Sequence, residues 1–128
     1  STVSSIVVSG ANDTAMTIVQ PANSFLLNAG VIVRTAIAGS SGNINIKIGT
    51  ADDGAQIAAA AALMSSDTAV AINTVFSSTG QGEGAVDLAF AAEAPLFTAT
   101  ERTLHIRAEA SATVTAGELQ PFIVYGNI

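Results

Sequence analysis

His105 is the only histidine of the chain, and its imidazole is the side chain with the widest chemical range, from general base to metal ligand. A catalytic triad would need a serine and an aspartate to converge on it, yet the sequence holds no G-x-S-x-G elbow. With one histidine and no cysteine, paired-histidine sites, thiolate metal sites and thiol nucleophiles are excluded. His105 alternates with Leu104 and Ile106, so we interpret it as part of a polar strand face, solvated or packed against a neighbouring subunit.

The stretch Asp52-Asp53-Gly54 is a candidate for a carboxylate metal site. A calcium loop needs its oxygen ligands at the D-x-[DN]-x-[DN]-G spacing, which lets one loop wrap the ion, and this spacing is absent. Aspartate and glycine also suit the positions of a β-turn for reasons of backbone conformation. We therefore predict a turn that ends a strand, and no metal ligand at this pair or at Asp87.

Two further motifs match their patterns only weakly. Gly80-Gln81-Gly82-Glu83-Gly84 has the glycine content of a phosphate loop, but it lacks the G-K-[ST] ending and the G-x-G-x-x-G spacing. Because Glu83 would also repel phosphate, we interpret this stretch as a surface loop. Asn12-Asp13-Thr14 matches a glycosylation sequon, which carries no weight without an export signal.

Aromatic side chains, which commonly stack against sugars, are scarce in this chain. There is no tryptophan and one tyrosine, Tyr125, which counts against a glycosidase and a carbohydrate-binding module. The five phenylalanines lie among apolar neighbours, which predicts that they belong to the core: Phe25, Phe76, Phe90, Phe97 and Phe122. We predict no catalytic residue, no cofactor and no metal ligand, and hence a protein that is not an enzyme.

Charge and hydropathy restrict the classes of partner that we expect for this chain. Ten acidic residues oppose Lys47, Arg34, Arg102 and Arg107, which neither cluster nor alternate with aromatics, so we expect no nucleic acid partner. Every apolar run is interrupted before 18 residues and the first residues lack a basic region, so we expect no membrane span and no export. Charged residues make up 11% of the chain, against about 25% in an ordinary soluble domain, which favours surfaces that associate.

The elements that must position these residues are β-strands. The large apolar set holds 12 Ile and 11 Val against 7 Leu, and residues branched at Cβ favour strands. Turn-forming residues, among them Asn28-Ala29-Gly30 and Thr115-Ala116-Gly117, separate segments of strand length. We predict strands over residues 4–9, 15–20, 25–27, 31–38, 43–50, 70–76, 86–90, 103–110 and 119–125. The segment 31–38 has apolar groups on both faces, which predicts a central or doubly covered strand.

The segment Gln56 to Met64 has five consecutive alanines and departs from this pattern. Alanine is the best helix former, and Asp53 upstream is available as an N-cap, so a short helix crossing between the sheets is favoured. The alternative is a tight strand whose alanines allow another chain to approach closely.

The predicted fold class is all-β, an antiparallel two-sheet jelly roll or β-sandwich with, at most, that one short helix. Residues 1–128 form one domain in this interpretation. Residues 1–12 are either an arm that adds to another subunit's sheet or the first strand of this one.

Three stretches resemble small jelly-roll virion proteins of tailed bacteriophages, which decorate or cement the outside of a capsid. They are Gln20 to Asn23 leading into Val31 to Ala36, Gly42 to Thr50 continuing to Ile57, and Glu101 to Arg107 with the closing Ala116 to Tyr125. The resemblance implies a non-enzymatic homotrimer that binds the major capsid protein, located in the virion and assembled in the host cytoplasm. It assigns no role to an individual residue.

Two classes of function follow. The first is a structural virion protein, a capsid decoration or cement protein. The second is a receptor- or glycan-binding head module of a phage tail fibre. For the first class we expect shape and apolar burial to dominate capsid binding, through Ser1 to Asn12 and loops at one end, because exposed ion pairs contribute little.

Overall fold

The computed structural model describes residues 4–5, 13–39, 43–64, 70–78, 88–111 and 114–127. Within these ranges every regular element is a strand, and the nine strands are β1 (Ser4–Ser5), β2 (Asp13–Gln20), β3 (Ser24–Gly39), β4 (Ile44–Gly49), β5 (Ala58–Met64), β6 (Val75–Ser77), β7 (Phe97–Thr98), β8 (Arg102–Ala110) and β9 (Val114–Asn127). The predicted all-β class with two antiparallel sheets is confirmed.

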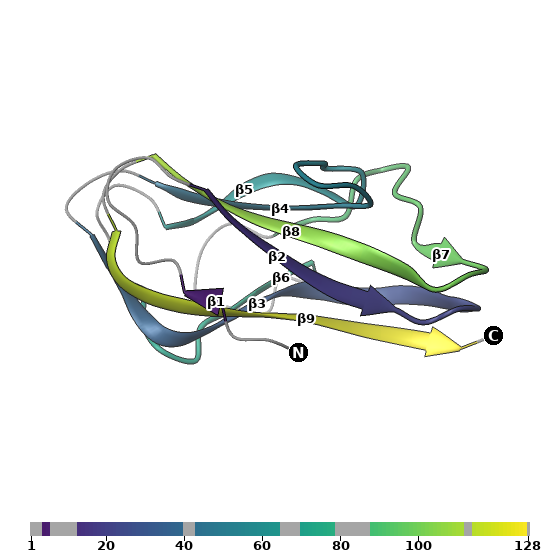
Figure 1. The fold of residues 1–128 in the computed structure, drawn as a ribbon, viewed down its shortest axis with the longest axis horizontal. Helices are drawn as coiled ribbons and strands as arrows, with labels where there is room; N and C mark the ends of the chain where they lie inside the picture. The colour runs from purple at the N-terminus through teal and green to yellow at the C-terminus, as the bar shows by residue number, and fades with distance from the viewer. Residues whose placement is uncertain are drawn as a thin grey trace.

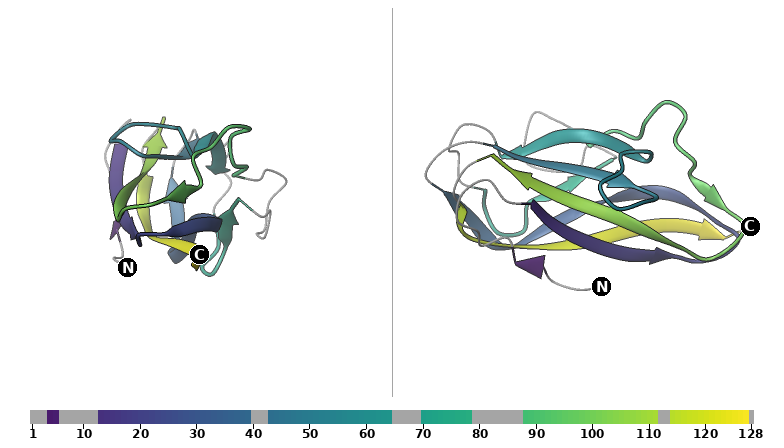
Figure 2. Two further views of the ribbon diagram at one scale, coloured as in Figure 1. Left: turned by 90° about the vertical axis from the view of Figure 1, so that its right-hand side faces the viewer. Right: turned by 45° about the horizontal axis from the view of Figure 1, so that its top comes forward.

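The two sheets pack face to face as two layers, which Figure 1 shows from the side and Figure 2 from one end. One sheet has the order β1-β9-β3-β6, with β7 also pairing with β3, and the other has the order β2-β8-β4-β5. Early strands pair with late ones in a nested series: β1 with β9, β2 with β8, β3 with β6 and β4 with β5. A chain whose two halves pair in this way and then roll into two sheets has the strand order of a jelly roll.

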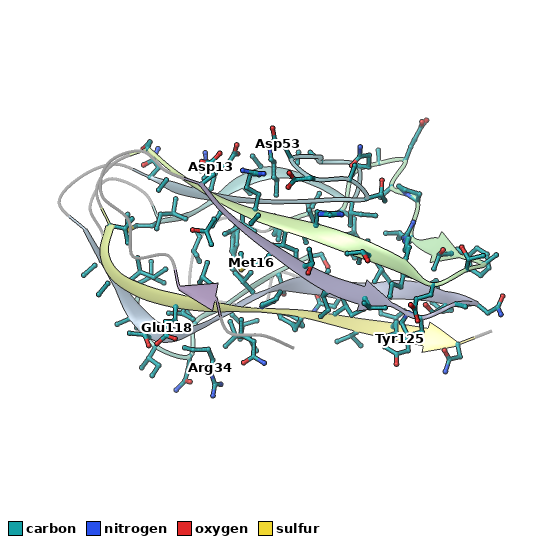
Figure 3. All side chains as sticks on the ribbon, viewed as in Figure 1. Asp13, Met16, Arg34, Asp53, Glu118 and Tyr125 are labelled. Carbon is teal, nitrogen blue, oxygen red and sulfur yellow. The ribbon has the colours of Figure 1, made fainter. Side chains whose placement is uncertain are left out.

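The core lies between the two layers and follows from the alternation in the strands. In β4, Ile44, Ile46 and Ile48 are fully buried, while Asn45 and Lys47 on the other side remain partly exposed. In β8 the buried residues are Leu104, Ile106 and Ala108. Met16 of β2 also points into the space between the sheets (Figure 3). Every second side chain thus enters one apolar cluster, as the period of a strand requires.

The long strands β3 and β9 pass through two of the predicted turns, which were wrong. Asn28-Ala29-Gly30 and Ala116-Gly117 lie inside strands that pair along most of their length. The pairing shifts register between Leu26 and Asn28 and again between Val33 and Ala38. Turn-forming residues in a strand commonly mark such bulges, and Gly117, with a φ of 153°, lies beside the second one. The prediction that 31–38 is central is confirmed, because β3 lies between β9 and β6.

The favoured helix in the alanine-rich segment was wrong, and the strand alternative is what forms. β5 pairs with β4, and Ala58 also bridges to Phe90. Ile57 and Met64 are buried at its two ends, so the segment is anchored in the core as an extended chain. The helix preference of alanine amounts to less than about 1 kcal/mol per residue, which tertiary pairing readily overrides.

A buried polar bridge closes one end of the sandwich. The Nε2 of Gln20, a fully buried side chain, donates to the carbonyl oxygens of Ser24 and Leu96 at 3.2 and 3.0 Å. Arg102 Nε donates to Gln20 Oε1 at 2.8 Å, so both ends of the amide are satisfied. Residues 21–23 form a turn between β2 and β3, with Asn23 at a φ of 55°. This bridge joins β2 and β8 to the segment that leads into β7.

Two predicted strands were largely wrong, because the described parts of 70–76 and 86–90 form only isolated bridges at Val70 and Phe90 and the start of β6. Of residues 70–76, Val70 makes an isolated bridge to Ile37, and β6 begins at Val75. Of residues 4–9, Ser4 and Ser5 pair with Leu119 and Glu118 of the same chain, which favours a first strand over an arm at these two positions. Residues 1–3, 6–12 and 86–87 lie outside the described residues.

Candidate functional site

The outer face of the sheet β2-β8-β4-β5 gathers most of the charge that the structure describes. We call the following six residues the ionic face: Asp13, Lys47, Asp52, Asp53, Arg107 and Glu109. Cross-strand register explains the gathering, because Arg107 lies between Ala15 of β2 and Lys47 of β4, and Glu109 lies between Asp13 and Asn45. Figure 3 shows Asp13 and Asp53 together on this side of the molecule.

Two cations hold four carboxylates on the ionic face. Lys47 Nζ lies 2.5 Å from Asp53 Oδ1 and 3.3 Å from Glu109 Oε2. Arg107 reaches Asp52 at 2.9 Å, Asp13 at 3.4 Å and Asp53 at 3.4 Å. The side chains of Lys47 and Arg107 are only 13% and 19% exposed, whereas those of Asp52 and Asp53 are 66% and 63% exposed. The carboxylates therefore cover the cations.

The pKa shifts of Lys47 and Asp53 indicate that both groups are charged. The hydrogen bond from Lys47, reinforced by the charge of that lysine, lowers the pKa of Asp53 below its ordinary 3.8. The same hydrogen bond, with a smaller contribution from Glu109, raises the pKa of Lys47 above 10.5 against the opposing effect of burial. Because a lysine acts as a nucleophile only when neutral, this contact is an ion pair and not a reactive amine beside a carboxyl group.

His105 lies on the same outer face, next to the ionic cluster. The predicted position, on the side of β8 that carries Arg107 and Glu109, is confirmed. Its cross-strand neighbours are Thr17 on β2 and Gly49 on β4. Neither neighbour is a serine or a carboxylate, so the strand pairing brings no triad partner to the imidazole.

Asp52 and Asp53 form the predicted turn. Gly54 N–H donates to the carbonyl of Ala51 at 3.0 Å, and Asp53 has a φ of 63°. In the described part of the chain no three acidic or histidine side chains gather as metal ligands. Sequence reasoning missed that this turn folds back onto the sheet, although a signal was present: two basic residues in outward strand positions are balanced by acidic residues just past a strand end.

The outer face of the other sheet has the opposite character. Apolar side chains alternate with the buried positions of β3 and β9, and we call the following six residues the apolar face: Phe25, Ile32, Val75, Phe97, Phe122 and Val124. Phe97 and Val124 are 48% and 46% exposed. The ring of Phe25 lies over Gly126, its cross-strand partner. Arg34 and Glu118 lie on this side at the far end (Figure 3), where Glu118 accepts a hydrogen bond from Thr35.

The apolar face corrects the interpretation of the phenylalanines as core. Phe76 is buried in the core and Phe90 packs against it. Phe97 is nearly half exposed, and Phe25 and Phe122 are partly covered on the outer side of the sheet. The local sequence around them is apolar because both faces of this sheet are apolar, which periodicity within one strand does not distinguish from a core position.

Some candidate residues are not placed. Asn12, Gly80 to Gly84 and Asp87 lie outside the described residues. No described segment is a helix with the length and hydrophobicity of a membrane span. Comparison of the chain with models of protein families, with curated proteins and with solved structures found no match.

Proposed function

We propose that this chain is a structural virion protein of a tailed bacteriophage, a capsid decoration or cement protein that binds the major capsid protein as a homotrimer. The observation that carries the proposal is the contrast between an uncovered apolar face and an ionic face whose charges are paired within the chain. The likeness in sequence to small jelly-roll virion proteins supplies the class, and the nested strand order is compatible with it.

A second copy of this chain is the occupant we assign to the apolar face. Phenylalanines and β-branched residues spread over four paired strands form a surface that is favourable to remove from water, at about 25 cal/mol per Å². The centres of protein interfaces are depleted of charge and enriched in aromatic residues, as this face is. A trimer would then hold the capsid through three weak attachments at a high effective concentration.

The ionic face supports a capsid attachment that does not depend on salt. Lys47 and Arg107 are each engaged by two or more carboxylates of their own chain, which leaves little positive charge on this face for a partner. We expect attachment through shape and apolar contact, which survives about 1 M salt, where the Debye length is near 3 Å.

Two measurements test this proposal in sequence. Light scattering of the purified chain is expected to give about 38 kDa, three times 12.7 kDa. Quantitative mass spectrometry of the virions that contain it is expected to give hundreds of copies, with binding to emptied capsids that persists in high salt.

Specific outcomes contradict each part of the proposal. A stable 12.7 kDa monomer at micromolar concentration contradicts the trimer. A few copies located at the tail, with adhesion to host cells, favour the fibre-head alternative. Deletion of residues 1–10 tests whether the N-terminal residues contribute to capsid contact, which is expected to weaken.

A further inference from the structure

Residues 50–56, which link β4 to β5, lie back over the outer face of the sheet that they leave. They pack against Gly49, an outward-facing position of β4. A Cβ atom at this position would lie 2.4 Å from the backbone carbonyl carbon of Gly54. The Oε1 of Gln56 accepts a hydrogen bond from Thr50 N–H at 3.0 Å, which ties the two ends of the loop together. We call residues 50–56 the strap.

Charge holds the tip of the strap to the sheet. Asp53 contacts Lys47 of β4, and Asp52 contacts Arg107 of β8, so the tip reaches two neighbouring strands. The Nε of Arg107 is a buried atom without a hydrogen bond, and its ionic partner is Asp53 at 3.4 Å. The strap therefore covers cationic groups that the remaining carboxylates, Asp13 and Glu109, engage only at 3.3–3.4 Å.

We propose that the strap is a charge-latched cover with two states, closed over Lys47 and Arg107 at ordinary ionic strength and lifted when salt screens its carboxylates. No side chain of the strap is fully buried, whereas strand side chains on either side of it are. The strap can therefore lift while β4 and β8 stay paired. Lifting uncovers Lys47 and Arg107, which then keep only Glu109 and Asp13 as ionic partners. This property is independent of any role in a virion.

Protonation supplies a second, weaker control of the same latch. The titratable and charged groups that face the strap are Asp13 of β2, Lys47 of β4, and His105, Arg107 and Glu109 of β8. Because Lys47 lowers the pKa of Asp53 from 3.8, the strap stays latched through neutral pH and lifts only in stronger acid. Salt is therefore the control at neutral pH.

Hydrogen exchange of backbone amides, read by NMR, tests the proposal in the full chain. The reporters are the amides of Thr50 and Gly54, which donate within the strap. Between about 0.05 and 1 M sodium chloride we expect their exchange to accelerate by at least about tenfold, while core amides such as those of Ile46 and Leu104 stay protected.

Charge variants distinguish a strap that is held by ion pairs from one that is held by packing alone. The double variant Asp52→Asn with Asp53→Asn is expected to exchange fast at low salt and to lose its salt response. The matched control, Glu93→Gln with Glu101→Gln, removes two exposed acids elsewhere and should behave as the parent chain. Slow exchange in the first variant, or in the parent at 1 M salt, overturns the proposal in favour of packing on Gly49. Equal acceleration of core and strap amides overturns it as well, because the strap would then not open as a separate unit.

Discussion

The two outer faces of this sandwich are built from strands of the same kind and yet end in opposite states. Of the 14 charged side chains in the sequence, six meet on the outer side of β2-β8-β4-β5. The outer side of β9-β3-β6 carries phenylalanine, isoleucine and valine at the equivalent alternating positions. A face whose cations are paired within one chain needs no partner to neutralise them, whereas covering an apolar face with a partner is favourable in free energy.

The same contrast appears in two glycines at which another segment approaches closely. At Gly30 on the apolar side, a Cβ would lie 2.0 Å from the backbone oxygen of Phe76 in the paired strand β6. At Gly49 on the ionic side, the approaching segment is the strap, a loop. The first neighbour is part of a sheet and the second can move, so identical substitutions should differ in cost.

The largest effect is expected for Gly30→Ala. The methyl group cannot be placed without separating β3 from β6, so we expect the free energy of unfolding to fall by about 3 kcal/mol. Gly49→Ala should cost about 1 kcal/mol, because the strap can lift to make room. Urea unfolding of both variants measures the difference, and equal costs would show that the strap is as rigid as a strand.

The next largest effect concerns association through the apolar face. Val124→Lys places an unpaired charge in the proposed interface, and we expect affinity between copies to fall by at least about a hundredfold. The matched control is Val19→Lys on β2, a valine of similar exposure on the other sheet, at 51% against 46%. Sedimentation or light scattering reads the outcome. If the Val19 variant dissociates and the Val124 variant does not, the roles of the two faces are reversed.

A smaller effect is expected when the ionic face loses a cation. Arg107→Gln removes the partner of Asp13 and Asp52, but these carboxylates are exposed and return to water. We expect a loss of at most about 1 kcal/mol in the free energy of unfolding, which shrinks as salt is added. Thermal unfolding at low and high salt measures it, and a loss of several kcal/mol would show that the cluster supports the core.

The pH dependence of stability should carry the sign set by the Lys47–Asp53 pair. The pKa of Asp53 is lower in the folded chain than its ordinary 3.8, so its stabilising effect is present above that value and is lost as pH falls through the folded pKa. The pKa of Lys47 is raised above 10.5, so its effect is present below that value and is lost as pH rises through the folded pKa. Asp53→Asn should flatten the acid side of a stability profile, and an unchanged profile would contradict the pairing.

The smallest expected effect is that of a chelator. Asp52 and Asp53 are held by cationic side chains, so EDTA should leave the unfolding temperature unchanged. A clear loss of stability in EDTA would show that an ion binds among these carboxylates or at Asp87.

Much of the fold was predictable because the alternation of residues is a local property. The strands around Ile44 to Ile48 and Leu104 to Ala108 were expected, along with the buried side of each and the outward position of His105. The turn at Asp52 and Asp53 was expected as well, since aspartate and glycine fit its backbone. The candidate surfaces were not predicted, because each is assembled from strands distant in the sequence.

The sequence by itself determined that this chain is all-β and which side of most strands is apolar, because β-branching and period-two alternation act within a few residues. Only the tertiary structure decided that the alanine-rich segment is the edge strand β5 and that Asn28-Ala29-Gly30 continues a strand. It also decided that Asp52 and Asp53 fold back onto Lys47 and Arg107. In the first two cases the local preference is at most about 1 kcal/mol per residue, and pairing with other strands outweighs it.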